Sequence, residues 1–422
     1  MQINKQAKIT LLMVEESPKN LESFAKLIKN VYDLDTIVKM EPFLKMKNHP
    51  QYNEYYNLFF STILPWMINR VKAFLKSRSM SVLDRLKCNI QKSISLTKSE
   101  TCDLLIAMFF GIYDMPGKNI HVDLFQWLCG YESIYCEKLL CLFEYFRQFI
   151  LTKPEGTIKI SRHVLSHIYT KEMLTSDCTP LKPVRLFQQG LIGDIPKDIK
   201  VDFANKYIGG GVLGTGCVQE EIMFTIAPEL IVSMLFCDVM KDVESICIEG
   251  TRPYSKYTGY AWTFKFDGPL LNSTNTSDTI IAIDALHFRS YPQEQLLQNT
   301  LLREFNKAYI GFSSPETKDA IATGKWGCGA FRGYAPIKFL LQWIACSLLN
   351  KDIHFYTFDD ILLTNQISDF VAFVDKYHIT VGQLTNSLML LLFNSINEMN
   401  SEVQINNSFF AYMKESLSKY TE

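Results

Sequence analysis

The chain has 422 residues, with 43 Lys and Arg against 44 Asp and Glu, and its formal net charge is −1. A balance this close to neutral excludes a protein that coats nucleic acid through its bulk charge. The hydrophobic share of 47% and the aromatic share of 13% exclude a disordered chain and supply a packed core. From the length we expect two domains, over residues 1–150 and 151–422.

The first residues carry charges every few positions and no continuous apolar core, so no secretory signal is visible. The most apolar runs, 339–349 and 388–393, are far shorter than the ~18 residues of a membrane-spanning helix. We therefore expect an intracellular protein without membrane association. The 11 cysteines form no CxxC pair, so we expect reduced core thiols and neither disulfides nor a zinc site. We expect no metal and no cofactor.

Residues 52–146 carry a helical pattern, because apolar side chains recur there at three- and four-residue spacing. Pro65 is expected to start or kink a helix, and Ser99-Glu100 after Thr97 indicates a capped, buried helix. Between Arg70 and Lys98 eight Lys or Arg accompany one acid. This stretch is either a solvated helical face or a contact surface for a polyanion.

After Lys153-Pro154-Glu155-Gly156 the pattern changes, and short β-rich runs alternate with helical segments. The predicted strands are 157–161, 199–203, 245–249, 279–283 and 353–358. Such alternation predicts an α/β fold with a largely parallel or mixed sheet and helices on both faces. Ligands of such folds bind at the carboxyl ends of the strands.

A strand, a glycine-rich loop and a helix start follow one another over residues 201–221, VDFANKYIGGGVLGTGCVQEE. Five glycines in eight positions lose much conformational entropy on folding. They are therefore expected only where the backbone needs positive φ or closely approaches another group. Glycine loops before helix N-termini offer N–H groups to phosphate. Residues 209–214 also match GxGxxG, the dinucleotide-binding fingerprint, although this match alone is weak.

Gln219-Glu220-Glu221 places two carboxylates in the first turn of that helix. Stabilisation of the helix dipole is one interpretation, but two negative charges beside a phosphate loop favour a chemical role. Adjacent helical residues point about 100° apart, so the two acids cannot flank one bond as paired glycosidase carboxylates do. We predict that one acid performs the chemistry while the other holds substrate.

A second glycine-rich loop, residues 324–333, lies between a predicted strand and the apolar helix 336–349. Two such loops at neighbouring strand ends could clamp a pyrophosphate, leaving Phe331 or Phe358 to stack on a base. A plain glycine turn with a core aromatic is the other interpretation of this loop.

Gly209-Gly210-Gly211, followed after a short spacer by Gln219-Glu220-Glu221, resembles the signature of the poly(ADP-ribose) glycohydrolase family. The resemblance extends over most of the chain from about residue 50, more weakly in the helical half. It also covers 201–205, 254–261, 283–288, 303–312, 322–331 and 355–358. The family implies a macrodomain-like three-layer α/β/α mixed sheet with an N-terminal, mostly helical accessory region. It also implies hydrolysis of the ribose–ribose O-glycosidic bonds of poly(ADP-ribose).

The resemblance assigns roles to the residues that match the family motif. Glu221 would protonate the leaving ribose hydroxyl and then activate water, and Glu220 would hold the ribose hydroxyls. Asp202 and Asn205 would orient the catalytic loop and the substrate ribose, and Gln219 would contact substrate. For Glu221 to act as an acid near neutral pH, we expect a closed, partly desolvated pocket.

The remaining substrate-binding residues are also assigned by resemblance. Tyr260 would pack over the ligand, Phe358 would stack on adenine and Phe331 would lie by the distal ribose. The other predicted contacts are Gly209, Gly210, Gly211, Lys325, Trp326, Gly327, Cys328, Gly329, Ala330, Ile192 and Gly193.

The sequence departs from the family pattern at several of these places. Gly193 and Asp194 stand where the family has its adenine-binding acid, after Ile192. Lys325 replaces an asparagine, Arg332 a glycine and Trp262 a glutamate. None of these substitutions falls in Gln219-Glu220-Glu221, so we expect activity.

Two other functions remain open. One is a macrodomain that binds ADP-ribose or its polymer without cleaving it, although Glu220 and Glu221 serve no purpose in a simple anion binder. The other is an oxidoreductase built on residues 209–214, for which Glu229 has the spacing of a ribose-binding acid, about 20 residues on. The dinucleotide-binding fold places this acid at the end of a strand. Glu229 instead follows Pro228 and begins a helical segment, which argues against the oxidoreductase.

The family also implies partners and a location. We expect poly(ADP-ribose) and ADP-ribosylated proteins as partners, with no requirement for direct nucleic-acid binding, and a monomer. The expected location is the nucleus, the cytoplasm or both.

Overall fold

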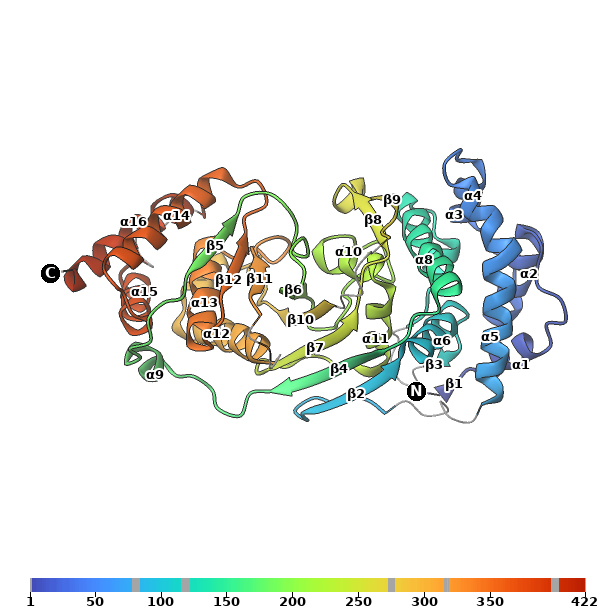
Figure 1. Cartoon of the computed structure of the whole chain (residues 1–422), viewed down its shortest axis with the longest axis horizontal. Coiled ribbons are helices and arrows are strands. Elements are labelled where there is room, and N and C mark those ends of the chain that lie inside the picture. The colour runs from blue at the N-terminus through green and yellow to red at the C-terminus, as the bar shows by residue number, and fades with distance from the viewer. Residues whose placement is uncertain are drawn as a thin grey trace.

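A computed structural model describes residues 2–77, 84–114, 122–271, 278–314, 317, 319–395 and 402–421. Helices of the N-terminal region lie at one end of the molecule, a mixed sheet lies in the middle, and the C-terminal helices lie at the other end (Figure 1). The N-terminal helices are α1 (Lys5–Leu12), α2 (Leu21–Val31), α3 (Glu41–Asn48), α4 (Asn53–Leu58), α5 (Leu64–Lys76), α6 (Lys98–Phe109), α7 (Phe125–Cys129) and α8 (Ser133–Thr152).

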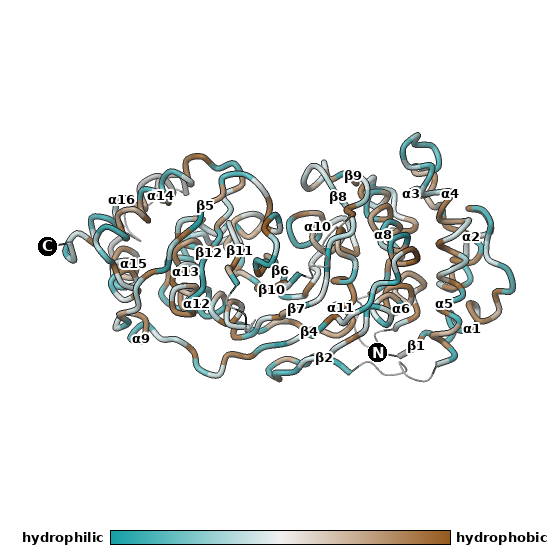
Figure 2. The backbone as a smooth tube through the Cα atoms, in the orientation of Figure 1, coloured by the Kyte–Doolittle hydropathy of each residue, from teal (hydrophilic) through white to brown (hydrophobic). Residues whose placement is uncertain are grey.

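The predicted helical signals are confirmed at two points. Thr97 caps α6 in a reciprocal box with Glu100, as expected for a capped helix. Pro65 lies in the first turn of α5, directly after a π-helical turn over Phe59–Ile63. Brown segments along α8 mark its apolar residues (Figure 2). The aromatic rings of Phe24, Phe43, Phe59 and Phe143 pack together inside this helical region.

The central sheet has eight strands in the order β2-β4-β7-β10-β6-β11-β12-β5. The strands are β2 (Lys92–Thr97), β4 (Thr157–Val164), β5 (Val184–Phe187), β6 (Ile199–Ala204), β7 (Glu244–Thr251), β10 (Asp278–Asp284), β11 (Ile321–Gly324) and β12 (Ile353–Tyr356). The run from β10 to β5 is parallel, and the pairs among β2, β4, β7 and β10 are antiparallel. The predicted mixed α/β sheet is confirmed.

Two short pairs stand outside this sheet, β1 (Gln2–Ile3) with β3 (Tyr113–Asp114) and β8 (Ser255–Thr258) with β9 (Lys265–Pro269). The helices of the second half are α9 (Lys171–Thr175), α10 (Gln219–Ile226), α11 (Ser233–Phe236), α12 (Gln298–Ser313), α13 (Ala335–Leu348), α14 (Ile361–Lys376), α15 (Val381–Ser395) and α16 (Glu402–Leu417).

Two sequence expectations need correction. Strand β2 lies inside the half predicted to be helical and pairs antiparallel with β4, so the first 150 residues contribute an edge strand to the central sheet. The last predicted strand ends at Tyr356, because Phe358 and Asp359 turn the chain with φ of 51° and 59°. The proposed domain boundary near residue 150 stays a prediction.

The basic stretch 70–98 does not lie on one helix. Helix α5 ends at Lys76, and β2 begins at Lys92. Most of its described cations bond to protein groups: Arg70 pairs with Asp103, Arg85 with Asp238 and Lys98 with Glu229. Arg78 lies outside the described residues. These three charges hold elements together, whereas Lys76 and Lys87 are exposed.

The parallel part of the sheet positions the site. Parallel strands β5, β6, β10, β11 and β12 have their carboxyl ends at one edge. The segments that leave this edge are the glycine loop after β6, the second glycine loop after β11 and the turn at Phe358 after β12. Since β6 and β11 are direct neighbours, the two loops emerge side by side, as expected.

Candidate active site

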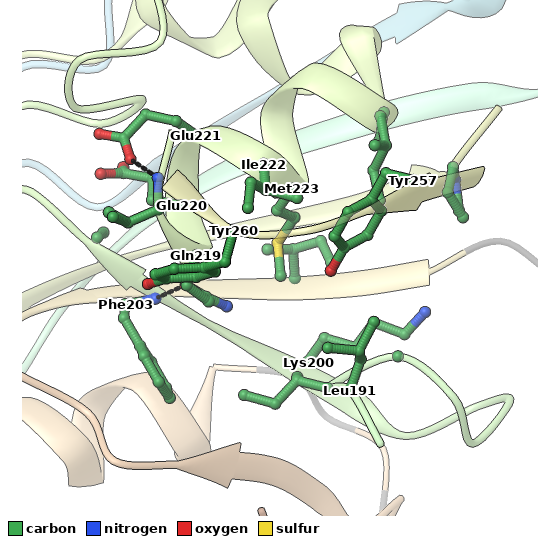
Figure 3. A pocket seen from close by; sticks show the side chains of 18 of the residues that line it. Leu191, Lys200, Phe203, Gln219, Glu220, Glu221, Ile222, Met223, Tyr257 and Tyr260 are labelled. Carbon is green, nitrogen blue, oxygen red and sulfur yellow. Dashed lines mark hydrogen bonds between the residues drawn. The ribbon is translucent and has the colours of Figure 1, made fainter. Parts of the chain in front are cut away.

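A cavity of about 970 Å³ lies at this edge of the sheet, a size typical of small-molecule sites. Gln219, Glu220 and Tyr260 gather at one end with Phe203, whereas Leu191 and Lys200 line the other end (Figure 3). The predicted site residues that line the cavity are Asn205, Gln219, Glu220, Glu221, Tyr260, Lys325, Trp326, Gly327, Gly329, Ala330, Phe331, Phe358, Ile192 and Gly193. The cavity lining does not include five other predicted site residues, namely Asp202, Gly209, Gly210, Gly211 and Cys328.

The two adjacent glutamates are held by backbone amides. Glu220 accepts from the amides of Gly209 at 2.7 Å and Asn205 at 2.8 Å. Glu221 accepts from the amides of Gly211 at 2.8 Å and Val218 at 3.0 Å. Both carboxyl groups are almost fully buried yet border the cavity. Their positions are therefore set by the loop backbone and not by side-chain packing alone.

The first N–H groups of the glycine loop donate to groups of the protein itself. Their role therefore differs from the predicted binding of phosphate. The amides of Gly209 and Gly211 bind the two carboxylates, and that of Gly210 donates to the Tyr207 carbonyl at 3.1 Å. The glycines are needed because the chain folds back tightly: a Cβ on Gly216 would lie 2.9 Å from the backbone of Gly211. This loop positions the two glutamates, and few of its N–H groups remain to bind a phosphate.

Asp202 lies on β6 behind the two glutamates, fully buried. Neither of its carboxyl oxygens has a hydrogen-bond partner among the described residues. Burial raises the pKa of Asp202 well above its usual range, and the negative charge of Glu221 raises it further. Burial and Asp202 also raise the pKa of Glu220, whereas the amides of Asn205 and Gly209 lower it. Asp202 has no such amides, so no hydrogen bond among the described residues stabilises its ionised form.

Gln219 and Asn205 flank the acids. The Gln219 amide group bridges β6, accepting from the Phe203 amide at 2.8 Å and donating to the Val201 carbonyl at 3.0 Å. Asn205 lines the cavity, and its Oδ1 accepts from the Tyr207 amide at 3.0 Å. Gln219 thus fixes the helix start to the strand, while Asn205 retains donors for a ligand.

Tyr260 covers the acids at the cavity rim and is 55% exposed. Its pKa is raised by burial and by the negative charge of Glu221, and lowered by a hydrogen bond to the Gln219 backbone. The next residue, Ala261, donates its amide to the Cys217 carbonyl at 2.9 Å. The Tyr260 turn is therefore fastened to the glycine loop.

The second glycine loop retains free amides. Within the described part of the chain, the amides of Gly327, Gly329 and Ala330 have no acceptor, and all three residues line the cavity. The loop is fixed by Trp326, whose indole donates to the Ile283 carbonyl at 2.9 Å. This loop, more than the first, has donors for a pyrophosphate. Lys325 lies at the cavity with its Nζ 3.6 Å from Asp360.

Phe358 follows β12 and lies against Gly324, where a Cβ would approach its ring to 2.8 Å. Its ring stacks beside Tyr356 with centroids 6.4 Å apart. Phe331 is half-buried and packs against His287, with centroids 5.3 Å apart. Both rings reach the cavity, so they are more than core residues.

The opposite end of the cavity contains residues that the sequence analysis did not single out. Lys200 and Asp278 form a largely buried ion pair, with Nζ 2.6 Å from the carboxylate, and Tyr257 lies nearby (Figure 3). Asp194 lines the same end and accepts from the Leu191 amide at 2.7 Å. Strand periodicity could have placed Lys200 on the face of Asp202, but no motif marks it.

Two features are absent from the residues that the structure describes. No group of three or more His, Cys, Asp or Glu in that part of the chain could hold a metal ion. No helix among those residues is long and apolar enough to cross a bilayer.

Comparisons with known proteins agree with this geometry. A family model described as "Poly (ADP-ribose) glycohydrolase (PARG), Macro domain fold" matches residues 171–365. A second, described as "Poly (ADP-ribose) glycohydrolase (PARG), helical domain", matches residues 52–162.

Several curated proteins are similar over most of this chain. "Poly(ADP-ribose) glycohydrolase 1" of Caenorhabditis elegans is 34% identical over 69% of this chain and 39% of its own length. "Poly(ADP-ribose) glycohydrolase 2" of the same organism is 33% identical over 72% of this chain and 65% of its own. "Poly(ADP-ribose) glycohydrolase 1" of Arabidopsis thaliana is 29% identical over 75% and 71%. The chain thus spans less than two thirds of the two nematode proteins.

Proposed function

Because the chain belongs to the poly(ADP-ribose) glycohydrolase family, we propose that it hydrolyses the ribose–ribose O-glycosidic bonds of poly(ADP-ribose) and releases ADP-ribose. The observation that carries the proposal is the pair Glu220 and Glu221, each held by two backbone amides at the edge of the cavity. A site that only bound anions would gain nothing from two buried carboxylates.

In this proposal Glu221 is the single acid and base. It protonates the leaving ribose oxygen as the glycosidic bond breaks, and the resulting carboxylate then takes a proton from the attacking water. Adjacent positions on α10 prevent Glu220 from acting on the opposite face of the same sugar. Glu220, with a carboxylate fixed by the amides of Asn205 and Gly209, is suited to accept hydrogen bonds from ribose hydroxyls.

The groups that line the cavity indicate how the other parts of the ligand would bind. The amides of Gly327, Gly329 and Ala330 would donate to the pyrophosphate oxygens. The negative charge of that group would stabilise the positive charge that develops on the ribose in the transition state. Phe358 would stack on the adenine, and Tyr260 would cover the ribose at the reacting end.

A non-catalytic reader of ADP-ribose is the second candidate, and it predicts binding without turnover. The oxidoreductase hypothesis has lost its basis, since Glu229 is buried and binds Lys98 with both carboxylate oxygens, at 2.9 and 2.8 Å. Glu229 also does not line the cavity, so it is not placed to bind the ribose of a cofactor there.

The experiment that tests the proposal incubates the purified chain with poly(ADP-ribose) and measures released ADP-ribose. We expect the chain to release ADP-ribose from the polymer. In a thermal-shift assay, ADP-ribose should stabilise the protein and NAD should not. Stabilisation by ADP-ribose without release of product would favour the reader and overturn the hydrolase.

The cellular setting forms part of the same proposal. We infer that the chain acts as a monomer on the polymer carried by ADP-ribosylated proteins, inside the nucleus, the cytoplasm or both, and does not require direct binding of nucleic acid. This inference rests on the family resemblance and on the near-neutral net charge.

A further inference from the structure

Lys138 belongs to α8 of the N-terminal helical region, but its side chain reaches the glycine loop of the catalytic half. Its Nζ donates to the carbonyls of Val212, Gly214 and Gly216, each at 2.7 Å. An ammonium group has three N–H donors, so every donor of Lys138 is used on this one loop. The side chain is fully buried.

Trp127 of α7 strengthens the same contact. Its indole nitrogen donates to the Val212 carbonyl at 2.9 Å, and the Lys138 Nζ lies 5.5 Å from the centre of its ring. The loop is thus bound on two sides. Its carbonyls accept from the helical region, while its amides at Gly209 and Gly211 donate to Glu220 and Glu221.

We propose that Lys138 is a positioning residue for the hydrolysis, holding residues 209–216 in the one conformation that presents Glu220 and Glu221 to substrate. The inference rests on the proposed function and deepens it, because it gives the helical region a defined part in catalysis. A loop with this many glycines has many accessible conformations, and fixed external hydrogen bonds are the means of selecting one of them. A displacement of about 1 Å at a reacting group can cost ~100-fold in rate.

The groups facing Lys138 are Cys217 in the loop, Glu221 on α10 and Cys141 on α8 itself. Burial lowers the pKa of Lys138 to about 8, and these three groups oppose the shift by raising it. When the amine loses its proton, two N–H donors remain for three carbonyls. The activity of the wild type should therefore fall as the pH rises through about 8.

The test compares Lys138→Met with Lys351→Met, a matched control. Lys351 is also buried and donates to a backbone carbonyl, that of Phe312 at 2.8 Å. For Lys138→Met we expect kcat on poly(ADP-ribose) to fall ~100-fold, with KM and the Kd for ADP-ribose almost unchanged. Amide hydrogen exchange over residues 209–216 should accelerate. Lys351→Met should lower Tm while kcat and loop exchange stay at wild-type values.

A second variant keeps the test decisive if Lys138→Met does not fold. Lys138→Arg retains a charge at all accessible pH values, so the wild-type rate divided by the rate of this variant should fall as the pH rises through about 8. The proposal is overturned if Lys138→Met keeps wild-type kcat and loop exchange, or if this ratio of rates stays constant with pH. If the wild type binds ADP-ribose but cleaves nothing, the hydrolase proposal fails, and loop exchange in the two methionine variants still decides whether Lys138 holds the loop.

Discussion

Gly210 lies so close to Glu220 that a Cβ at this position would be 2.5 Å from the Glu220 carboxylate. The same Cβ would be 2.6 Å from the carboxylate of Glu221. The backbone of Gly210 has φ of +49°, a region that side chains disfavour. The glycine is therefore required by the positions of the two acids and by the turn itself.

Replacing Gly210 should consequently disable the site. Gly210→Ala would push both carboxylates away from the amides that hold them, and we expect kcat on poly(ADP-ribose) to fall at least ~100-fold. The measurement is the steady-state rate of ADP-ribose release.

Gly214→Ala provides the control within the same loop. A Cβ there would meet only the Gly211 carbonyl oxygen, at an ordinary 3.6 Å. We expect it to keep most of its activity. Equal losses in the two variants would show that the loop tolerates no alanine at all, and the specific role of Gly210 would be lost.

Asp202 should make the free energy of unfolding fall as the pH rises, which is the opposite of the usual effect of an Asp. Its pKa is raised in the folded protein by burial and by Glu221, so the folded state binds a proton that the unfolded state releases above its ordinary pKa of ~3.9. Stability from this group is present in acid and is lost as pH rises toward the folded pKa, by about 1.4 kcal/mol per pH unit.

Asp202→Asn removes that proton equilibrium. In thermal unfolding, the Tm of the variant relative to the wild type should therefore increase as the pH rises above the ordinary Asp pKa of ~3.9. A difference in Tm that stays constant over this range would mean that Asp202 is ionised in the folded protein.

Phe358 is the residue for which we predict an effect on binding rather than on chemistry. Removing its ring in Phe358→Ala should weaken ADP-ribose by ~1–3 kcal/mol, the usual value of stacking a base on an aromatic side chain. Calorimetric titration measures this Kd. Phe331→Ala, at the other ring of the cavity, should affect the adenine less, which can be checked by titrating AMP.

A variant of Lys98 tests whether this residue of the basic stretch stabilises the fold or binds a polyanion. Its ammonium is buried against Glu229, and removing one partner of such a pair typically costs ~3–5 kcal/mol. Lys98→Met should lower the free energy of unfolding by this amount, as measured by urea denaturation. The salt dependence of polymer binding should stay unchanged. A reduced salt dependence would restore the polyanion surface as an explanation.

The sequence predicted those parts of the structure that depend on local pattern. Strands β4, β6, β7 and β10 have alternating or continuous apolar residues between turn signals, and the predicted ranges match them closely. The start of α10 at Gln219 and the placement of both glycine loops after neighbouring strands were also predictable. These features require only nearby residues.

Long-range pairing was not predictable in this way. Strand β2 has only a short alternation of polar and apolar residues, KSISLT, and its place in the sheet depends on β4, which lies about 60 residues later. The burial of Lys98, Lys138 and Arg162 was hidden for the same reason, since their partners are distant in sequence. The glycine loop looked like a phosphate cradle because sequence cannot show that its amides already bind Glu220 and Glu221.

The central claim is that Glu221 is the single acid and base, and Glu221→Gln tests it most directly. Glutamine preserves the shape of the side chain and can still accept from the Gly211 amide, but it cannot transfer a proton. The release of ADP-ribose from poly(ADP-ribose) should fall ~10²–10⁴-fold, while ADP-ribose binds the variant with a Kd close to that of the wild type. Cleavage at a rate near that of the wild type, with binding intact, would contradict this account and move the catalytic role to another group.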